Sequence, residues 1–154
     1  MSRRFYRPVL LAVVVVLQLG LFAPTAGATT PPVQFGKIQY DSPGSDTGSN
    51  ASLNAEYFVV KNYSGTTRAM HSWTVRDAQG HVYTFPSTFQ LGPNAGVRVH
   101  TGKGTNAGSD RYWGRSWYVW NNGGDTARLR NAGGTQIDGC SWTSDGSGYK
   151  ICPT

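Results

Sequence analysis

The chain is poor in the residues and motifs that carry catalytic chemistry. It has only two cysteines, three histidines and eight acidic residues among 154. The histidines are scattered, and none lies in a recognisable metal-binding or nucleophile motif (His71, His81, His100). The sequence contains no GxSxG, HExxH or phosphate-loop pattern. We therefore expect a protein that is not an enzyme and that holds no metal ion or cofactor.

Long apolar runs are also scarce. The run from Val9 to Phe22 has fourteen residues, fewer than the ~20 that a membrane-spanning helix needs. Three arginines precede it and small residues follow it (Arg3, Arg4, Arg7; Ala26 to Ala28). This three-part pattern predicts a signal peptide over residues 1–28 and a secreted, extracellular protein without stable membrane insertion after cleavage. The adjacent arginines leave ordinary secretory export and twin-arginine export both open.

Secretion and removal of the leader affect two properties of the mature chain, its net charge and the pairing of its cysteines. Three of the fourteen basic residues leave while all eight acidic residues stay, so the net charge falls from +6 to +3. Such a modest charge does not by itself require an anionic partner. In an oxidising compartment, Cys140 and Cys152 are expected to pair, because no CxxC spacing or nearby histidine suggests a metal site. The disulfide would pin a C-terminal tail, residues 140–154.

Short strands and turns dominate the rest of the chain. Six segments are rich in β-branched or aromatic residues, and most alternate with period two (57–62, 73–77, 81–85, 96–100, 126–131, 135–139). Glycine, asparagine and aspartate gather between them, as in turns. Residues 29–36 suit an extended lead-in, and residues 41–52 a loop. The pattern predicts an all-β, antiparallel sandwich or barrel.

Aromatic and basic residues are concentrated between Asp110 and Asn131. Five of the nine residues from Tyr112 to Trp120 are aromatic. If residues 117–120 form a strand, both of its faces carry aromatic rings, so we assign Trp117 and Trp120 mainly to the core. Tyr112 and Trp113 precede that strand and are better placed for contact with a ligand. The candidate binding residues are aromatic or basic (Arg111, Tyr112, Trp113, Arg115, Arg128, Arg130), although a solvated sheet face explains the arginines equally simply.

Six fragments of the chain form an ordered set: "NAEYFVVKN" (54–62), "SWTVRD" (72–77), "YTFP" (83–86), "VRVHTGKG" (97–104), "WNNGGDTARLRN" (120–131) and "GTQID" (134–138). In this order they resemble the bacterial lamin tail domain family. The resemblance implies an immunoglobulin-like β-sandwich over residues 37–139. It also implies that Asn54, Glu56 and Asn62 occupy structural positions of the family's sequence pattern. Trp73 would be the buried core tryptophan. Ser72 stands where the family usually has glycine.

The resemblance carries over no catalytic residue. Members occur alone or beside secreted hydrolases, and animal lamin tails contact DNA and partner proteins. Our first hypothesis is therefore a secreted, non-enzymatic binding or adaptor module that contacts a protein or surface partner. One alternative is an extracellular nucleic-acid-binding domain, which predicts a steep salt dependence. Another is a cell-wall carbohydrate-binding module that stacks sugars on aromatic rings.

Overall fold

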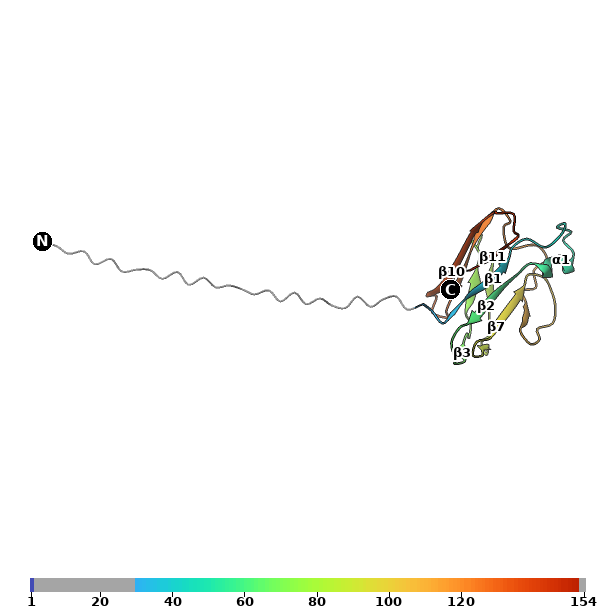
Figure 1. Ribbon diagram of the computed structural model, residues 1–154. Coiled ribbons are helices and arrows are strands. Elements are labelled where there is room, and N and C mark those ends of the chain that lie inside the picture. Colours follow the sequence, from blue (N-terminus) through green and yellow to red (C-terminus); the bar gives the residue numbers. More distant parts are fainter. Residues whose placement is uncertain (2–29, 153–154) are drawn as a thin grey trace.

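The computed structural model describes Met1 and residues 30–152, so the predicted signal peptide, Met1 apart, lies outside the described residues. The described chain forms two facing β-sheets, with a small two-stranded sheet at one end (Figure 1). The all-β prediction is confirmed. The only helix among the described residues is a single short one, α1 (Asn50–Ala55).

The first sheet has five strands. Their order across the sheet is β11 (Tyr149–Ile151), β1 (Val33–Gln39), β2 (Tyr57–Asn62), β7 (Gly96–His100) and β8 (Asp110–Tyr112). Neighbouring strands are antiparallel except β7 and β8, which are parallel. Because β7 and β8 run in the same direction, the segment between them is a crossover and not a hairpin.

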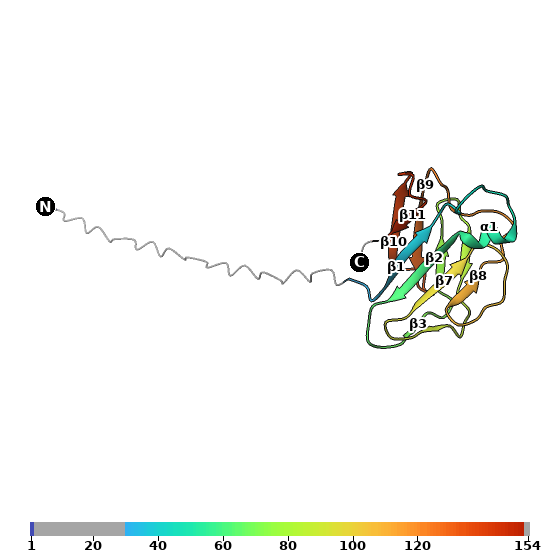
Figure 2. The ribbon, with the colours of Figure 1, turned by 45° about the vertical axis from the view of Figure 1, so that its right-hand side comes forward.

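The second sheet has four strands and faces the first (Figure 2). Its order is β10 (Gln136–Thr143), β9 (Gly124–Arg130), β4 (Thr74–Arg76) and β5 (Val82–Thr84). The small sheet pairs β3 (Arg68–Ala69) with β6 (Gln90–Leu91). The predicted strands at residues 57–62 and 96–100 are confirmed without change in their bounds, and the others shift by a few residues.

Side chains that alternate along the strands fill the space between the two sheets. Ile38 and Phe58 are paired across β1 and β2, and both are fully buried. From the opposite sheet, Leu129 and Val75 are paired across β9 and β4 and are also fully buried. Period-two alternation sends every second side chain of these strands inward, into the core between the two sheets.

The expectation of an uninterrupted loop over residues 41–52 was wrong, because α1 begins within that range. Ser49 caps the helix: its side-chain oxygen accepts a hydrogen bond from the Ser52 N–H. Leu53 is the one buried residue of the helix. Six residues make too few turns to show a 3.6-residue hydrophobic period, so the helix left no periodic signal in the sequence.

The sandwich extends beyond the boundaries expected at Lys37 and Gly139. β1 begins at Val33, β10 continues to Thr143, and β11 pairs with β1. The expected disulfide is confirmed, with both cysteines buried. Cys140 lies on β10 and Cys152 directly follows β11. The disulfide therefore joins the last strand of one sheet to the last strand of the other, and the C-terminal residues are part of the fold.

The turn before β4 differs from what the family pattern implied. Trp73 is only half-buried at the rim of the core, so its assignment as the buried core tryptophan was wrong. Trp120 and Trp142 occupy the interior, with exposures of 2% and 6%. Ser72 adopts a φ of 56°, a left-handed conformation that glycine adopts without steric cost. The family's glycine at this position thus has a conformational reason.

Candidate functional site

The candidate binding residues do not form one site. On β7, His100 follows the buried Val99 and therefore faces outward, and Tyr112 on β8 pairs with His100 and faces the same way. Arg128 and Arg130 alternate with the buried Ala127 and Leu129, so they point out of the four-stranded sheet. The two groups consequently lie on opposite outer faces of the sandwich.

The two aromatic residues assigned to ligand contact are both partly covered. The Trp113 ring is half-buried and packs edge-on against Phe58 and Trp120, with centroids 6.1 and 6.0 Å apart. Its indole N–H donates to the Val82 carbonyl at 3.1 Å. Tyr112 stacks on His100 at 5.0 Å. The Trp113 ring therefore belongs to the rim of the core, and only part of it is available to stack on a ligand.

The tryptophans assigned to the core divide differently from the prediction. Trp120 is buried at 2% exposure, as expected, whereas Trp117 is 66% exposed. Residues 117–120 form no strand, so the alternation argument that buried Trp117 does not apply. Trp117 lies in a bend beside Gly114, Arg115 and Ser116, where it lines a shallow surface hollow.

A buried carboxylate holds this aromatic segment in place. Glu56 is fully buried, and its Oε1 accepts hydrogen bonds from the Thr101 hydroxyl at 2.6 Å and the Val119 N–H at 2.8 Å. Its Oε2 accepts from the Trp120 N–H at 3.3 Å. Burial is the main effect on this group and raises its pKa from 4.5 to about 7, against the opposing effect of these hydrogen bonds. Glu56 was noted in the sequence only as a family pattern position.

An unpredicted row of residues crosses the outer face of the five-stranded sheet. Strand pairing places five residues in register, one on each strand, and we call them the outer row: Tyr149, Gln39, Tyr57, His100 and Tyr112. Four of the five are aromatic. Because each is directly opposite the next, their side chains are neighbours on one side of the sheet. Gln39 is buried at 9% exposure, so the rings on either side of it supply the accessible surface. The row could not be read from the sequence, since its members come from five strands whose pairing only the fold defines.

Two cations lie over the tyrosines of the outer row. The Lys37 Nζ is 4.4 Å from the ring centroid of Tyr149 and 5.8 Å from that of Tyr57. The Arg98 guanidinium lies 4.7 Å from the Tyr57 centroid. Within the described part of the chain, no carboxylate lies within 4.0 Å of either cation. This face therefore presents tyrosine rings together with two cations that, in the described region, form no ion pair within 4.0 Å, although Asp110 is the cross-strand neighbour of Arg98.

The opposite face carries three arginines. Arg76 pairs directly with Arg128 across β4 and β9, and Arg130 is two residues further along β9. Like charges directly opposite each other in a sheet repel. Over residues 30–152 no carboxylate forms an ion pair with any of the three. We call these residues the arginine face; the sequence indicated Arg128 and Arg130 but not Arg76.

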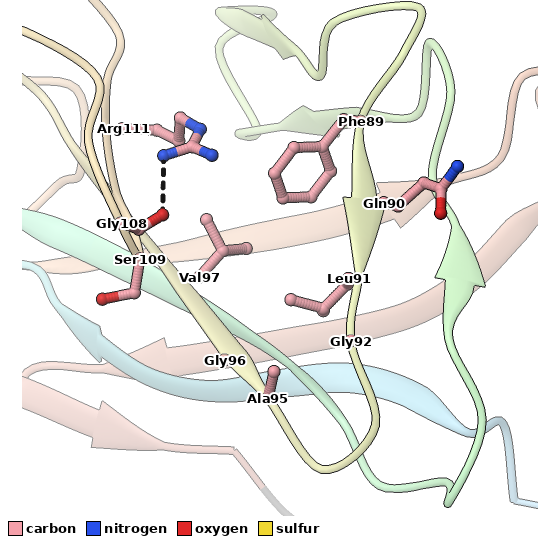
Figure 3. Close-up of a pocket in the computed structure, with 10 residues that line it drawn as sticks. All are labelled: Phe89, Gln90, Leu91, Gly92, Ala95, Gly96, Val97, Gly108, Ser109 and Arg111. Atoms are coloured by element: carbon pink, nitrogen blue, oxygen red, sulfur yellow. Dashed lines mark hydrogen bonds between the residues drawn. The ribbon is translucent and has the colours of Figure 1, made fainter.

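A cleft opens at the edge of the five-stranded sheet, near Arg111 (Figure 3). It has a volume of about 280 Å³. Phe89 and Leu91 on one side and Val97 on the other supply an apolar lining, and the Arg111 guanidinium reaches in from β8. The guanidinium lies 5.3 Å from the Phe89 ring centroid. Of the predicted binding residues, Arg111 is the one whose side chain lines this cleft.

The two histidine–aspartate pairs do not form a catalytic arrangement. His100 Nε2 lies 3.0 Å from an Asp110 oxygen, and its Nδ1 lies 2.6 Å from the Asn54 carbonyl, so both ring nitrogens are engaged. His81 bonds to the buried Asp77 through its backbone N–H and through Nδ1. In the described residues, no three His, Cys, Asp or Glu side chains come close enough together to hold a metal ion.

Comparison with known families agrees with the fold. The sequence model of the lamin tail domain matches residues 26–144, which is most of the chain. The chain belongs to the lamin tail domain family. A search of the curated proteins found no match. Membership confirms the immunoglobulin-like β-sandwich. The family is one of non-catalytic domains.

The matched region leaves out one strand of this lamin tail domain. The match ends at residue 144, whereas β11 begins at Tyr149 and Cys152 follows it. Tyr149, the first member of the outer row, therefore comes from a segment beyond the matched region, and the disulfide attaches that segment to β10. Across residues 30–152, no helix is long and apolar enough to cross a membrane.

Proposed function

We propose that this lamin tail domain is a secreted, non-enzymatic binding module that contacts a protein or surface partner through the outer row together with Lys37 and Arg98. One observation carries the proposal: tyrosine rings and two cations without an ion pair in the described chain share one outer sheet face. Tyrosine and arginine are enriched in the binding surfaces of proteins because they combine apolar area with hydrogen bonding. The proposal assigns this face to contact and assigns no residue to catalysis.

The position of β11 supports this assignment. Tyr149 and Ile151 on this edge strand are 41% and 60% exposed. Ile151 pairs with Lys37, so an exposed apolar side chain adjoins the cation that lies over Tyr149. The disulfide holds the strand in the sheet although it has only three residues. A partner would bury these exposed apolar groups while its acidic groups pair with Lys37 and Arg98.

Nucleic-acid binding is a second candidate, and the arginine face favours it. Arg76 and Arg128 repel each other across the strands, so an anion between them would relieve the repulsion. Duplex DNA titrated at several salt concentrations would test this. Replacing both Arg128 and Arg130 with glutamine should reduce the salt slope by about two, because each lost phosphate contact changes it by ~0.9.

Carbohydrate binding would use a different aromatic ring from the one expected. The sugar-stacking hypothesis rested on Tyr112 and Trp113, but Trp117 is the exposed ring of this segment, at 66%. Trp117→Ala should abolish binding to cell-wall glycan if this candidate is correct, with little change on varying the salt concentration. Binding that is unaffected by this substitution would remove the carbohydrate candidate.

The decisive experiment compares how variants of the two opposite sheet faces bind to the same cells. Fluorescently labelled protein, secreted after expression of the full chain, is titrated onto cells of the producing organism. Aliquots of those cells are first treated with protease, nuclease or cell-wall glycosidase. We expect saturable binding that protease abolishes and that the Lys37→Ala, Arg98→Ala variant lowers at least tenfold.

The matched control is the Arg128→Ala, Arg130→Ala variant, which removes two cations from the opposite face. Its binding should equal that of the unmodified protein. Equal binding by both double variants would overturn the proposal. Loss of binding after nuclease treatment, or after glycosidase treatment, would favour the nucleic-acid or the carbohydrate candidate instead.

A further inference from the structure

The cleft beside Arg111 contains an open section of strand edge. Along β7, the carbonyl of Ala95 bonds to β2, whereas the N–H of Arg98 and the carbonyl of His100 bond toward β8. Backbone groups of a strand alternate in direction, so the N–H and carbonyl of Gly96 also point toward the β8 side. β8 pairs with β7 only from Arg98 onward. Among the described residues none pairs with Gly96 on this side, so its N–H and carbonyl are a free donor and a free acceptor at the cleft.

Both ends of this open section are closed. The turn in which the Ala95 N–H donates to the Gly92 carbonyl lies at one end. The Ser109 carbonyl, which accepts from the Arg98 N–H at 2.8 Å, lies at the other. A long strand passing through would collide with one of them, whereas the end of a chain would fit. A volume of about 280 Å³ suits one or two residues.

The chemistry of the cleft selects which end of a chain it would take. Phe89, Leu91 and Val97 offer an apolar surface to one side chain. The Arg111 Nη1 donates to the carbonyls of Gly108 and Asp110 at 3.0 and 2.7 Å. In the described part of the chain, its other two nitrogens have no hydrogen-bond acceptor, and no carboxylate lies within ion-pair distance.

We propose that this cleft binds the C-terminus of a partner protein. The terminal carboxylate pairs with Arg111, the last side chain lies on Phe89, Leu91 and Val97, and the preceding backbone bonds to Gly96. Capture of a chain end by strand pairing plus a cationic group is an established mode of peptide recognition. The inference deepens the proposed function, on which it rests, by naming the part of a protein partner that this domain recognises.

The test uses fluorescein-labelled hexapeptides that end in valine, leucine, isoleucine or phenylalanine, each with a free C-terminal carboxylate and as the C-terminal amide. Binding is measured by fluorescence polarisation with the intact protein. We expect at least one carboxylate peptide to bind about tenfold more tightly than its amide, since a charge-assisted hydrogen bond is lost. Equal binding, or no binding, of all carboxylate and amide pairs would overturn the proposal without requiring any variant.

Two further measurements locate the binding. Arg111→Gln should weaken the carboxylate peptide about tenfold and leave the amide unchanged, whereas Arg128→Gln, on the opposite face, should change neither. In NMR spectra, the amide proton of Gly96 should shift and exchange more slowly when the peptide binds. Binding that leaves Gly96 unchanged would place the peptide elsewhere and refute the cleft assignment.

The outcomes separate this inference from the proposed function. Suppose that cell binding depends on Lys37 and Arg98 but the protein does not distinguish carboxylate from amide peptides. This result would support the proposed binding module and refute the binding of a C-terminus in the cleft. Peptide binding that depends on Arg111, in a protein that binds no cells, would uphold the cleft alone.

Discussion

Replacing Glu56 with glutamine is expected to flatten the pH dependence of the free energy of unfolding between pH 4.5 and 7. In the folded protein the pKa of Glu56 is raised from 4.5 to about 7, chiefly by burial, with a small contribution from the charge of Asp46. Glutamine has nearly the same shape and does not titrate in this range. It keeps one oxygen to accept the hydrogen bonds of Thr101 and Val119.

The sign and size follow from proton linkage. Between pH 4.5 and 7 the folded protein retains a proton on Glu56 that the unfolded chain has released. The stability contributed by this group is therefore fully present below pH 4.5 and is lost as the pH rises through about 7. The gap between the two pKa values corresponds to about 3 kcal/mol.

Urea denaturation followed by tryptophan fluorescence at pH 4.5, 5.5, 6.5 and 7.5 provides the measurement. All other titrating groups are shared, so the difference in unfolding free energy between the unmodified protein and Glu56→Gln isolates this carboxyl group. As the pH rises from 4.5 to 7.5, the unmodified protein should lose about 3 kcal/mol of unfolding free energy relative to Glu56→Gln. Parallel stability curves for the two proteins would refute the reasoning.

Three other predictions concern stability, measured by the same urea assay. Phe58→Ala should cost about 3–5 kcal/mol because the ring is fully buried, whereas Trp117→Ala, at an exposed ring, should stay within about 0.5 kcal/mol; equal losses would contradict the assigned burial. Reduction of the Cys140–Cys152 disulfide should lower the free energy of unfolding by about 3 kcal/mol. An unchanged urea midpoint in dithiothreitol would contradict a stabilising role of the disulfide. Ser72→Gly should stabilise by up to about 1 kcal/mol by relieving the left-handed backbone, and a loss of stability would show that the turn is not strained.

Local sequence patterns were sufficient to predict features that depend on a single strand. The segments at residues 57–62 and 96–100 were predicted with their observed bounds, because alternation along a half-buried strand is visible within a few residues. The disulfide followed from the presence of only two cysteines and the expected compartment. The all-β class followed from the strands and turns, and the lamin tail family from the resemblance of six ordered sequence fragments.

Predictions failed where placement depends on residues far apart in the chain. Trp117 was assigned to the core on the condition that residues 117–120 form a strand, and they form none. Trp113, a candidate for ligand contact, packs against Phe58 and Trp120. The outer row needed the pairing of five strands. The cleft depends on β8 beginning only opposite Arg98, which leaves Gly96 without a strand partner on that side.

By itself, the sequence determined the all-β class, the longer strands and the family, since these depend on periodicity and on short fragments in order. Only the tertiary structure decided which charged and aromatic side chains meet. Arg111 and Arg128 are seventeen positions apart in one basic stretch, yet one lines a cleft and the other lies on the opposite face. The physical reason is that strand pairing, and not distance along the chain, sets which side chains share a surface.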